Sequence, residues 1–183
     1  TTEIYTLSLH DALPISVFSN NYTYNFEKST AGWESTGMWH IINETSQYRN
    51  ANSGNSSFWY GNDLTGTYDS GTANSGRLVS PPINLKGSDK TTLTFWYWYQ
   101  TETMGNRYDQ RFVHIREAGS QEWEEIDQLY DDPMSQWLQK TYDISKYNGK
   151  VIEVSFYFDM ADGLANDYRG WYIDDVEIQV EKK

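Results

Sequence analysis

Short segments in which apolar and polar residues alternate, separated by clusters of glycine, asparagine, aspartate and serine, fill the chain from Asn20 onwards. Alternation with a period of two is typical of strands that are buried on one side only. Turn residues at regular spacing between such segments indicate a sandwich or a barrel. Because no stretch shows an extended apolar repeat of 3.6 residues, helix should be scarce. The pattern predicts an all-β fold built from two antiparallel sheets.

The segment Thr91–Thr101 is the strongest strand candidate. Its odd-numbered positions from Leu93 to Tyr99 share one face, whereas Trp96 and Trp98 share the other. Aromatic residues fit a pleated, half-buried surface well. Aromatic side chains on both faces indicate either a central strand or a strand with one face lining a concave aromatic surface.

The remaining strand candidates continue to the end of the chain without an internal repeat or a long linker. One short helical turn is expected at 143–147, and Pro81 should end the fourth strand because proline cannot donate to a ladder. We therefore expect residues 20–183 to form a single β-sandwich domain. The further strands are expected at Tyr22–Glu27, Met38–Ile42, Ser56–Gly61, Gly76–Ser80, Arg111–Glu117, Trp123–Leu129, Trp137–Tyr142, Val151–Asp159 and Gly170–Val180.

The first residues differ from the rest of the chain. Residues 1–16 lack the basic start and the continuous apolar run of a signal peptide. The segment Leu7–Ile15 resembles the peptide obtained by translating sequencing-adapter DNA. We expect residues 1–19 to be a non-native or disordered leader; a genuine linker or an extra strand is the alternative.

The charge balance limits the partners of the chain. With 14 basic and 26 acidic residues the formal net charge is −12. Nucleic-acid binding usually needs a basic stripe, and no such stripe is present. Apolar runs are far shorter than the ~20 residues that span a bilayer, so we expect neither nucleic-acid binding nor membrane insertion. Acidity makes divalent cations natural partners, although it can also serve solubility alone.

An ordered set of short motifs covers the chain from about Asn25 to Ile178 and resembles the MAM-like jelly-roll family of bacterial secreted proteins. The resemblance implies a galactose-binding-like sandwich. Each motif is weak alone, and their order carries the resemblance. Animal members carry cysteines, whereas this chain has none, which points to the bacterial branch. The motifs are Phe26-Glu27, Gly32-Trp33, Trp39, Ser57–Asn62, Tyr68–Gly71, Gly76–Leu85, Leu93–Tyr99, Asp109, Trp123, Trp137, Asp143–Ser145, Gly149, Phe156–Asp159, Asp162, Asn166 and Gly170–Ile178.

The resemblance implies a two-sheet jelly-roll sandwich that serves as an accessory domain. Related domains are attached to immune-inhibitor-A-type metallopeptidases and to surface-anchored proteins. The expected location is therefore extracellular or on the bacterial cell surface. The expected partner is a neighbouring catalytic domain of the parent protein, or a surface glycan or protein.

The same resemblance implies a structural Ca²⁺ between a glutamate on the first strand and an aspartate on the last. The matching positions are Glu27 and Asp175, with Asp174 as the competing choice and Asp69 as a further contributor from a loop. Adjacent residues of a strand point to opposite faces, so only one of the two aspartates should point at a given site. We favour Asp175, because Asp174 would share its face with apolar neighbours. The alternative is that these carboxylates are ordinary surface groups.

A carbohydrate-binding surface is the alternative function. Sugar rings stack on flat aromatic side chains, and the candidates are Trp59, Tyr60, Trp96 and Trp98. Aromatic residues in a sandwich are more often part of the core, where each buries ~150–250 Å².

Catalytic patterns are weak, and we expect no enzyme activity and no catalytic residues in this chain. The histidines His10, His40 and His114 stand apart without the HExxH spacing of a zincin. A G-x-S-x-G elbow is also absent from the sequence. A small hydrolase that uses paired carboxylates is the third hypothesis, and it would need two of them to face each other across a cleft.

Overall fold

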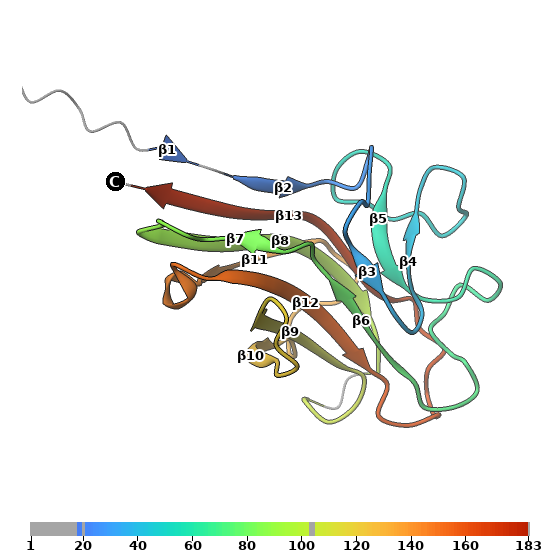
Figure 1. Cartoon of the computed structure of the whole chain (residues 1–183). Coiled ribbons are helices and arrows are strands. Elements are labelled where there is room, and N and C mark those ends of the chain that lie inside the picture. The colour runs from blue at the N-terminus through green and yellow to red at the C-terminus, as the bar shows by residue number, and fades with distance from the viewer. Residues whose placement is uncertain (1–17, 20, 103–104, 183) are drawn as a thin grey trace, which may run out of the picture.

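The computed structural model describes residues 18–19, 21–102 and 105–182, and these residues form two antiparallel sheets packed face to face (Figure 1). The strands within the described residues are β1 (Phe18–Ser19), β2 (Tyr22–Tyr24), β3 (Glu34–Ser35), β4 (Trp39–Ile42), β5 (Ser57–Tyr60), β6 (Ser75–Val79), β7 (Ile83–Asn84), β8 (Lys90–Gln100), β9 (Gln110–Glu117), β10 (Glu124–Gln128), β11 (Leu138–Asp143), β12 (Val151–Asp159) and β13 (Gly170–Lys182). A short 3-10 helix, η1, spans Ser145–Tyr147.

Sheet A contains the two longest strands. Its order is β11-β8-β13-β5-β4, and both β1 and β2 pair with β13. Figure 1 shows β2 and β8 on the two sides of β13. Strands from both ends of the chain therefore meet in one sheet, which brings the residues after β2 close to the middle of β13.

Sheet B has the order β10-β9-β12-β6-β3, and β7 pairs with the start of β12. The registers place β12 at its centre, with Tyr157 opposite Arg77 of β6 on one side and Phe112 of β9 on the other. Apart from the consecutive pair β9 and β10, neighbouring strands in this sheet are far apart in the sequence. Side chains from three separate segments therefore share one outer face.

The core lies between the two sheets and follows the alternation of the sequence. In β8, Leu93, Phe95, Tyr97 and Tyr99 are buried, while the even-numbered positions between them are half-buried on the outer face. In β12, Ile152 and Phe156 point into the same core. Burial of each such side chain contributes about 1.5–3 kcal/mol, so the two packed faces supply most of the driving force for this fold.

The predicted fold class is confirmed: the chain is an all-β, two-sheet antiparallel jelly-roll sandwich. Every predicted strand is present and most ends shift by a single residue, but β2 stops at Tyr24, so Glu27 lies after the strand on which it was expected; the helical turn appears as η1. The short strands β3 and β7 were not predicted, because two residues carry too little alternation to be recognised.

The prediction for the leader falls largely on residues 1–17, which lie outside the described residues. Phe18 and Ser19, assigned to the leader from the sequence, form β1 and pair with Lys182 and Glu181 of β13.

Candidate ligand and cation sites

Asp174 and Asp175 lie at an irregularity in the middle of β13. The register of β13 against β8 shifts between Asp174 and Glu177, and Asp175 has a positive φ of 45°. A bulge of this kind interrupts the two-residue alternation. Both carboxylates consequently reach the same two residues: backbone N–H groups of Asn52 and Ser53 donate to Asp174 Oδ2 at 2.8 and 3.2 Å, and Ser53 Oγ donates to Asp175 Oδ1 at 2.7 Å.

The expectation that only one of the two aspartates faces the site is therefore wrong. It assumed regular alternation, and the bulge changes the direction of Asp175. Asp174 is fully buried, whereas Asp175 is half-buried. The buried aspartate is thus the one that the sequence argument ranked second.

Glu27 meets the same loop a few residues further on. Its Oε1 accepts hydrogen bonds from the backbone N–H groups of Asn55 and Ser56 at 2.9 and 2.7 Å. Gly54 between the two contact points has a φ of 59°, and a Cβ there would overlap the Glu27 carboxylate. The segment 52–56 is therefore held by carboxylates at both ends, and only glycine fits at its closest approach.

The two adjacent aspartates beside this loop create an electrostatic cost. Burial, and next the neighbouring Asp175 carboxylate, raise the pKa of Asp174 to about 7. None of the ion pairs among the described residues includes Glu27, Asp174 or Asp175. Backbone and side-chain donors alone stabilise these anions in the structure.

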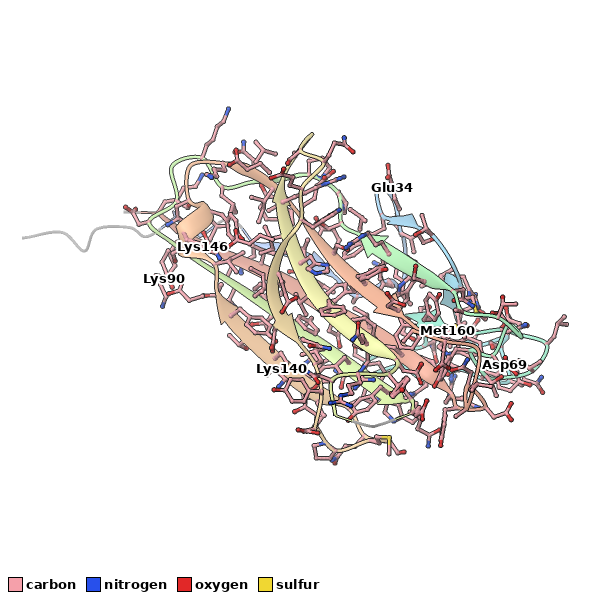
Figure 2. All side chains as sticks on the ribbon, turned by 90° about the horizontal axis from the view of Figure 1, so that it is seen from below. Glu34, Asp69, Lys90, Lys140, Lys146 and Met160 are labelled. Carbon is pink, nitrogen blue, oxygen red and sulfur yellow. The ribbon has the colours of Figure 1, made fainter. Side chains whose placement is uncertain are left out.

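Asp69 lies elsewhere. Its Oδ1 accepts a hydrogen bond from the backbone N–H of Gly71 at 2.7 Å, and none of its hydrogen bonds reaches the loop 52–56. Figure 2 shows Asp69 close to Met160, at the end of the sandwich opposite Lys90 and Lys146. Within the described residues, no group of three or more histidine or acidic side chains is arranged to hold a metal ion. The structure thus places three of the four predicted ligands against the same loop, but not in the arrangement of a metal site, and leaves Asp69 apart.

The predicted aromatic residues divide into two groups. Trp59 and Tyr60 have exposed fractions of 0%, so no ring face is left for a sugar. Trp96 and Trp98 are half-buried on the outer face of sheet A, which we call face A. Trp98 packs edge-on against Tyr172 with the ring centroids 5.3 Å apart.

The part of face A around Trp59 and Tyr172 is covered by the segment 43–56. Trp59 stacks on Tyr172 with centroids 5.6 Å apart, and Tyr48 from this segment packs on Trp59. Asn50 Oδ1 accepts a hydrogen bond from Trp137 Nε1 at 3.1 Å. A pocket of about 360 Å³ remains beside Trp98, lined also by Arg49, Asn50, Gln100 and Arg169.

The outer face of sheet B, face B, carries a second aromatic group that the sequence analysis did not single out. Figure 2 shows the molecule turned by 90° from the view of Figure 1 and seen from below, so that this sheet lies toward the reader. Arg116 and Arg77 stack on Trp123 at 4.3 and 5.0 Å, and Arg77 also lies 4.2 Å from the centroid of Tyr157. We call the whole set the guanidinium–aromatic ribbon; its members are Arg116, Trp123, Arg77, Tyr157, His114 and Phe112.

The ribbon continues from Tyr157 to β9. The rings of Phe112 and Tyr157 stack with centroids 6.1 Å apart, and Phe112 stacks on His114 at 5.4 Å. Burial and the nearby Arg77 lower the pKa of His114 to about 4, so its imidazole is neutral at pH 7. Side chains of β6, β9 and β12 and of the residue before β10 therefore form one continuous surface, on which His114 is buried and the other members are half-buried.

A signal for this surface exists in the sequence. Phe112, His114 and Arg116 alternate with apolar residues, which places them together on one face of a strand. Arg77 and Tyr157 come from strands whose pairing with this one is not visible in a single sequence. Their convergence needs the sheet order, which the structure supplies.

A further polar cluster is fully inside the sandwich. Arg111 is buried, lies 3.9 Å from the centroid of Tyr99 and donates to the carbonyl of Leu129 at 3.0 Å. Tyr68 donates to Asp109 Oδ2. Burial raises the pKa of Asp109 to about 6. This cluster holds the ends of strands together and offers no surface to a ligand.

A comparison with known proteins finds that the chain is similar to one part of a much larger bacterial protein. Bacillopeptidase F of Bacillus subtilis (strain 168) is 32% identical over 162 residues, which is 86% of this chain but 10% of the relative. The chain thus spans about a tenth of the length of the protein it matches. No protein-family model matches the chain, so the resemblance to the MAM-like family stays a prediction.

Solved structures show the same fold at low sequence identity. TmCBM61, solved with beta-1,4-galactotriose, is 14% identical with a TM-score of 0.52, over 81% of this chain and 88% of that one. The K2 cleaved adhesin domain of Lys-gingipain is 16% identical with a TM-score of 0.56, over 86% and 97%. The C-terminal family 22 carbohydrate-binding module of Clostridium thermocellum Xyn10B is 18% identical with a TM-score of 0.51, over 87% and 92%.

These likenesses establish that the chain has the jelly-roll fold seen in carbohydrate-binding modules and adhesin domains. Among the described residues, no helix is long and apolar enough to cross a membrane.

Proposed function

We propose that this chain is a non-catalytic accessory module of a larger, extracellular, peptidase-type bacterial protein, and that it binds a glycan on face B. The observation that carries the binding role is the guanidinium–aromatic ribbon, which places half-buried rings and hydrogen-bond donors side by side on one sheet. The place within a larger protein rests on the match to a tenth of Bacillopeptidase F.

Face B has the chemistry that a sugar needs. Apolar sugar faces pack on aromatic rings, and sugar hydroxyls take hydrogen bonds from neighbouring polar groups. Tyr157 and Phe112 supply half-buried rings, and Arg77 and His114 lie beside them. Face A offers less, because Trp59 and Tyr172 are packed against each other beneath the segment 43–56, and Trp98 packs edge-on against Tyr172. The fold supports the same role by analogy, since two of the similar structures are carbohydrate-binding modules.

The titratable groups favour a binding role over catalysis. A catalytic acid or base must be able to reach a substrate. Asp109, whose pKa is raised to about 6, is buried and bonded to Tyr68 and to the backbone of residue 102. Asp174 is fully buried beneath the loop 52–56. These two carboxyl groups thus lie where they shape the fold.

A structural Ca²⁺ remains part of the proposal, restricted to Glu27, Asp174 and Asp175. Three carboxylates without a cationic partner supply the kind of oxygen ligand that Ca²⁺ takes, and an ion beside Asp174 and Asp175 would offset the repulsion between these two. Against this, N–H and O–H groups already donate to oxygens of all three. A bound ion would therefore have to draw some of these oxygens away from the loop 52–56.

Thermal unfolding of the full chain with excess Ca²⁺ and then with chelator tests the cation. Binding to the folded state alone adds about 2.7 kcal/mol at a hundredfold excess over Kd, which moves the midpoint by several degrees. Asp175→Asn should abolish the shift, and Asp69→Asn should retain it. An unchanged midpoint in the wild-type chain, with metal analysis showing no calcium after purification, would remove Ca²⁺ from the account.

Affinity gel electrophoresis with a panel of soluble polysaccharides tests the glycan role. Retardation by at least one polysaccharide is expected for the wild-type chain and for the face A variant Trp96→Ala, whereas Tyr157→Ala should migrate as in a gel without polysaccharide. An assay for new reducing ends should stay flat with every polysaccharide. New reducing ends would contradict the non-catalytic role, and a panel without any retardation would remove the glycan role.

A further inference from the structure

Arg77 occupies the middle of face B and is held on two sides by aromatic rings. Its guanidinium carbon lies 4.2 Å from the centroid of Tyr157 and 5.0 Å from that of Trp123. Nη1 donates to Ser155 Oγ at 3.1 Å and lies 2.9 Å from His114 Nδ1. The rings and the hydrogen bonds of Nη1 fix the orientation of the guanidinium. The edge formed by Nε and Nη2 is therefore pre-organised.

That remaining edge has no partner in the protein. A guanidinium has five N–H donors, and Nη1 supplies only two of them. Among the described residues, none accepts a hydrogen bond from Arg77 Nε or Nη2, and no carboxylate lies within ion-pair distance of Arg77. Neither atom is among the buried unpaired ones, so both reach solvent. Three N–H groups therefore point out of the ribbon.

The other two arginines of sheet B are already used. Arg116 Nε donates to Glu153 Oε2 at 2.6 Å, which neutralises both groups at the far side of Trp123. Arg111 is buried in the core and donates to Thr101, Asp109 and Leu129. Arg116 keeps Nη1 and Nη2 for further partners, but Glu153 already balances its charge. Of these guanidiniums, only that of Arg77 combines a free edge on face B with a charge that no carboxylate balances.

His114 adds a second donor on the same face. An arginine can only donate, so His114 Nδ1 must accept from Arg77 and the proton of the neutral ring lies on Nε2. Nε2 is not among the buried unpaired atoms either. Beside the free edge of Arg77, face B thus presents the Nε2–H of His114 as a further donor. Neither side chain offers a competing acceptor there.

We propose that Arg77 makes face B selective for acidic saccharides, by holding the carboxylate of a uronate residue with its free Nε–Nη2 edge while the sugar ring packs on Tyr157. This inference rests on the proposed glycan role and names the class of sugar. The planar fork matches the two oxygens of a carboxylate, and such charge-assisted bidentate pairs are roughly twice as strong as neutral hydrogen bonds.

The net charge of −12 makes this selectivity unexpected from composition. Long-range repulsion of an acidic polymer is screened within about 8 Å at physiological ionic strength, whereas a bidentate contact acts at bonding distance. The discrimination should therefore persist in 0.15 M salt. It should depend on one residue and not on the total charge of the chain.

Isothermal titration of the full chain with matched saccharides tests the inference. The probes are oligosaccharides of polygalacturonate, alginate and hyaluronate, each with its carboxyl-reduced counterpart of the same backbone. For at least one pair, the wild-type chain should bind the acid about tenfold more tightly than the reduced form, which corresponds to about 1.4 kcal/mol.

Three variants locate the effect. Arg77→Gln should lose the preference while binding the reduced form within about twofold of wild type, and Arg77→Lys should recover little of it because a lysine lacks the fork. Arg49→Gln, an equal charge change at an exposed position beside face A, should keep the preference. Thermal unfolding of each variant checks that it is folded. If Arg77→Gln does not fold, Arg77→Lys still tests the role of the guanidinium.

The outcomes separate the inference from the function it rests on. Equal binding of acid and reduced forms, or a preference that Arg77→Gln retains, overturns the role of Arg77 and leaves the glycan role intact. No binding of any saccharide overturns both. A peptide with a free C-terminal carboxylate serves as a further probe; if it binds more tightly than its amide while the saccharides fail, the ligand of the fork is a peptide.

Discussion

The two outer faces of the sandwich are both rich in aromatic side chains, but they use them differently. On face A, Trp59 and Tyr172 are fully buried beneath the segment 43–56 and pack against each other. On face B, Phe112 and Tyr157 remain half-buried beside Arg77. Aromatic content alone therefore does not locate a ligand surface. What decides is whether a segment of the same chain already covers the rings.

The largest expected effect separates the faces by stability. Trp59→Ala removes a fully buried ring that stacks on Tyr172 and donates from Nε1 to the carbonyl of Arg169. Such a truncation should lower the free energy of unfolding by about 3–5 kcal/mol. Tyr157→Ala on face B should cost no more than about 1.5 kcal/mol, because its ring is half-buried. Urea denaturation of both variants measures the difference; equal losses would contradict the contrast between a closed and an open face.

The next effect concerns the contacts that hold the segment 43–56 over face A. Glu27→Ala leaves the N–H groups of Asn55 and Ser56 without their acceptor. Since the acceptor is a carboxylate, we expect the free energy of unfolding to fall by about 2 kcal/mol, measured by urea denaturation, and amide exchange at 52–56 to become faster. Asp69→Ala, which leaves that loop untouched, is the matched control. Unchanged exchange in Glu27→Ala would show that the cover does not depend on this carboxylate.

Acid should weaken face B. The pKa of His114 is lowered to about 4 in the folded chain by burial and then by Arg77, while the unfolded value is about 6.5. Between these values the unfolded chain binds more protons, so the contribution of His114 is full above pH 6.5 and is lost as the pH falls toward 4. Tyr157 and Phe112 pack on the same ring.

We expect His114→Gln to reduce the stability loss between pH 6.5 and 4 by about 1–2 kcal/mol relative to wild type. Asp109, with its pKa raised to about 6, changes stability in the opposite direction over this window, because its folded form binds the proton more readily. The comparison of wild type with variant removes that shared contribution. Identical pH profiles for the two chains would mean that His114 does not titrate with folding.

The smallest effect belongs to the half-buried part of face A. Trp96 lies on the outer side of β8 opposite Gln139 of β11. Trp96→Ala should change the free energy of unfolding by less than about 1 kcal/mol and leave ligand binding unchanged. Calorimetric unfolding and the polysaccharide gel measure the two quantities. A loss of retardation would move the ligand to face A.

The sequence was sufficient for the fold because local alternation and turn residues record each strand separately. Val151–Asp159 was predicted with the bounds that β12 has in the structure. It was sufficient only in part for the site. Glu27 and the aspartate pair do meet the same loop, but the bulge at Asp175 changed which carboxylate is buried. A positive φ at an aspartate leaves no mark in an alternating pattern.

The ribbon on face B shows a different limit. Each of its strands carries an ordinary alternating pattern, and the sequence order says nothing about β6 lying beside β12. For the same reason Trp59 and Tyr60 looked like candidates for a sugar surface, although both are fully buried. Tyr60 lies in the core between the sheets, and Trp59 lies under the segment 43–56. Neither form of burial can be predicted from the pattern of a single strand.

The most direct test of the account is the footprint of a bound saccharide on the chain. Amide chemical shifts of the isotopically labelled chain would be followed while the polysaccharide fragment that gives the strongest gel retardation is added. The account predicts the largest changes at Arg77, Phe112, His114 and Tyr157, with little change at Trp96 and Trp98. Changes confined to Trp96, Trp98 and Trp137 would place the ligand on face A and contradict the central claim.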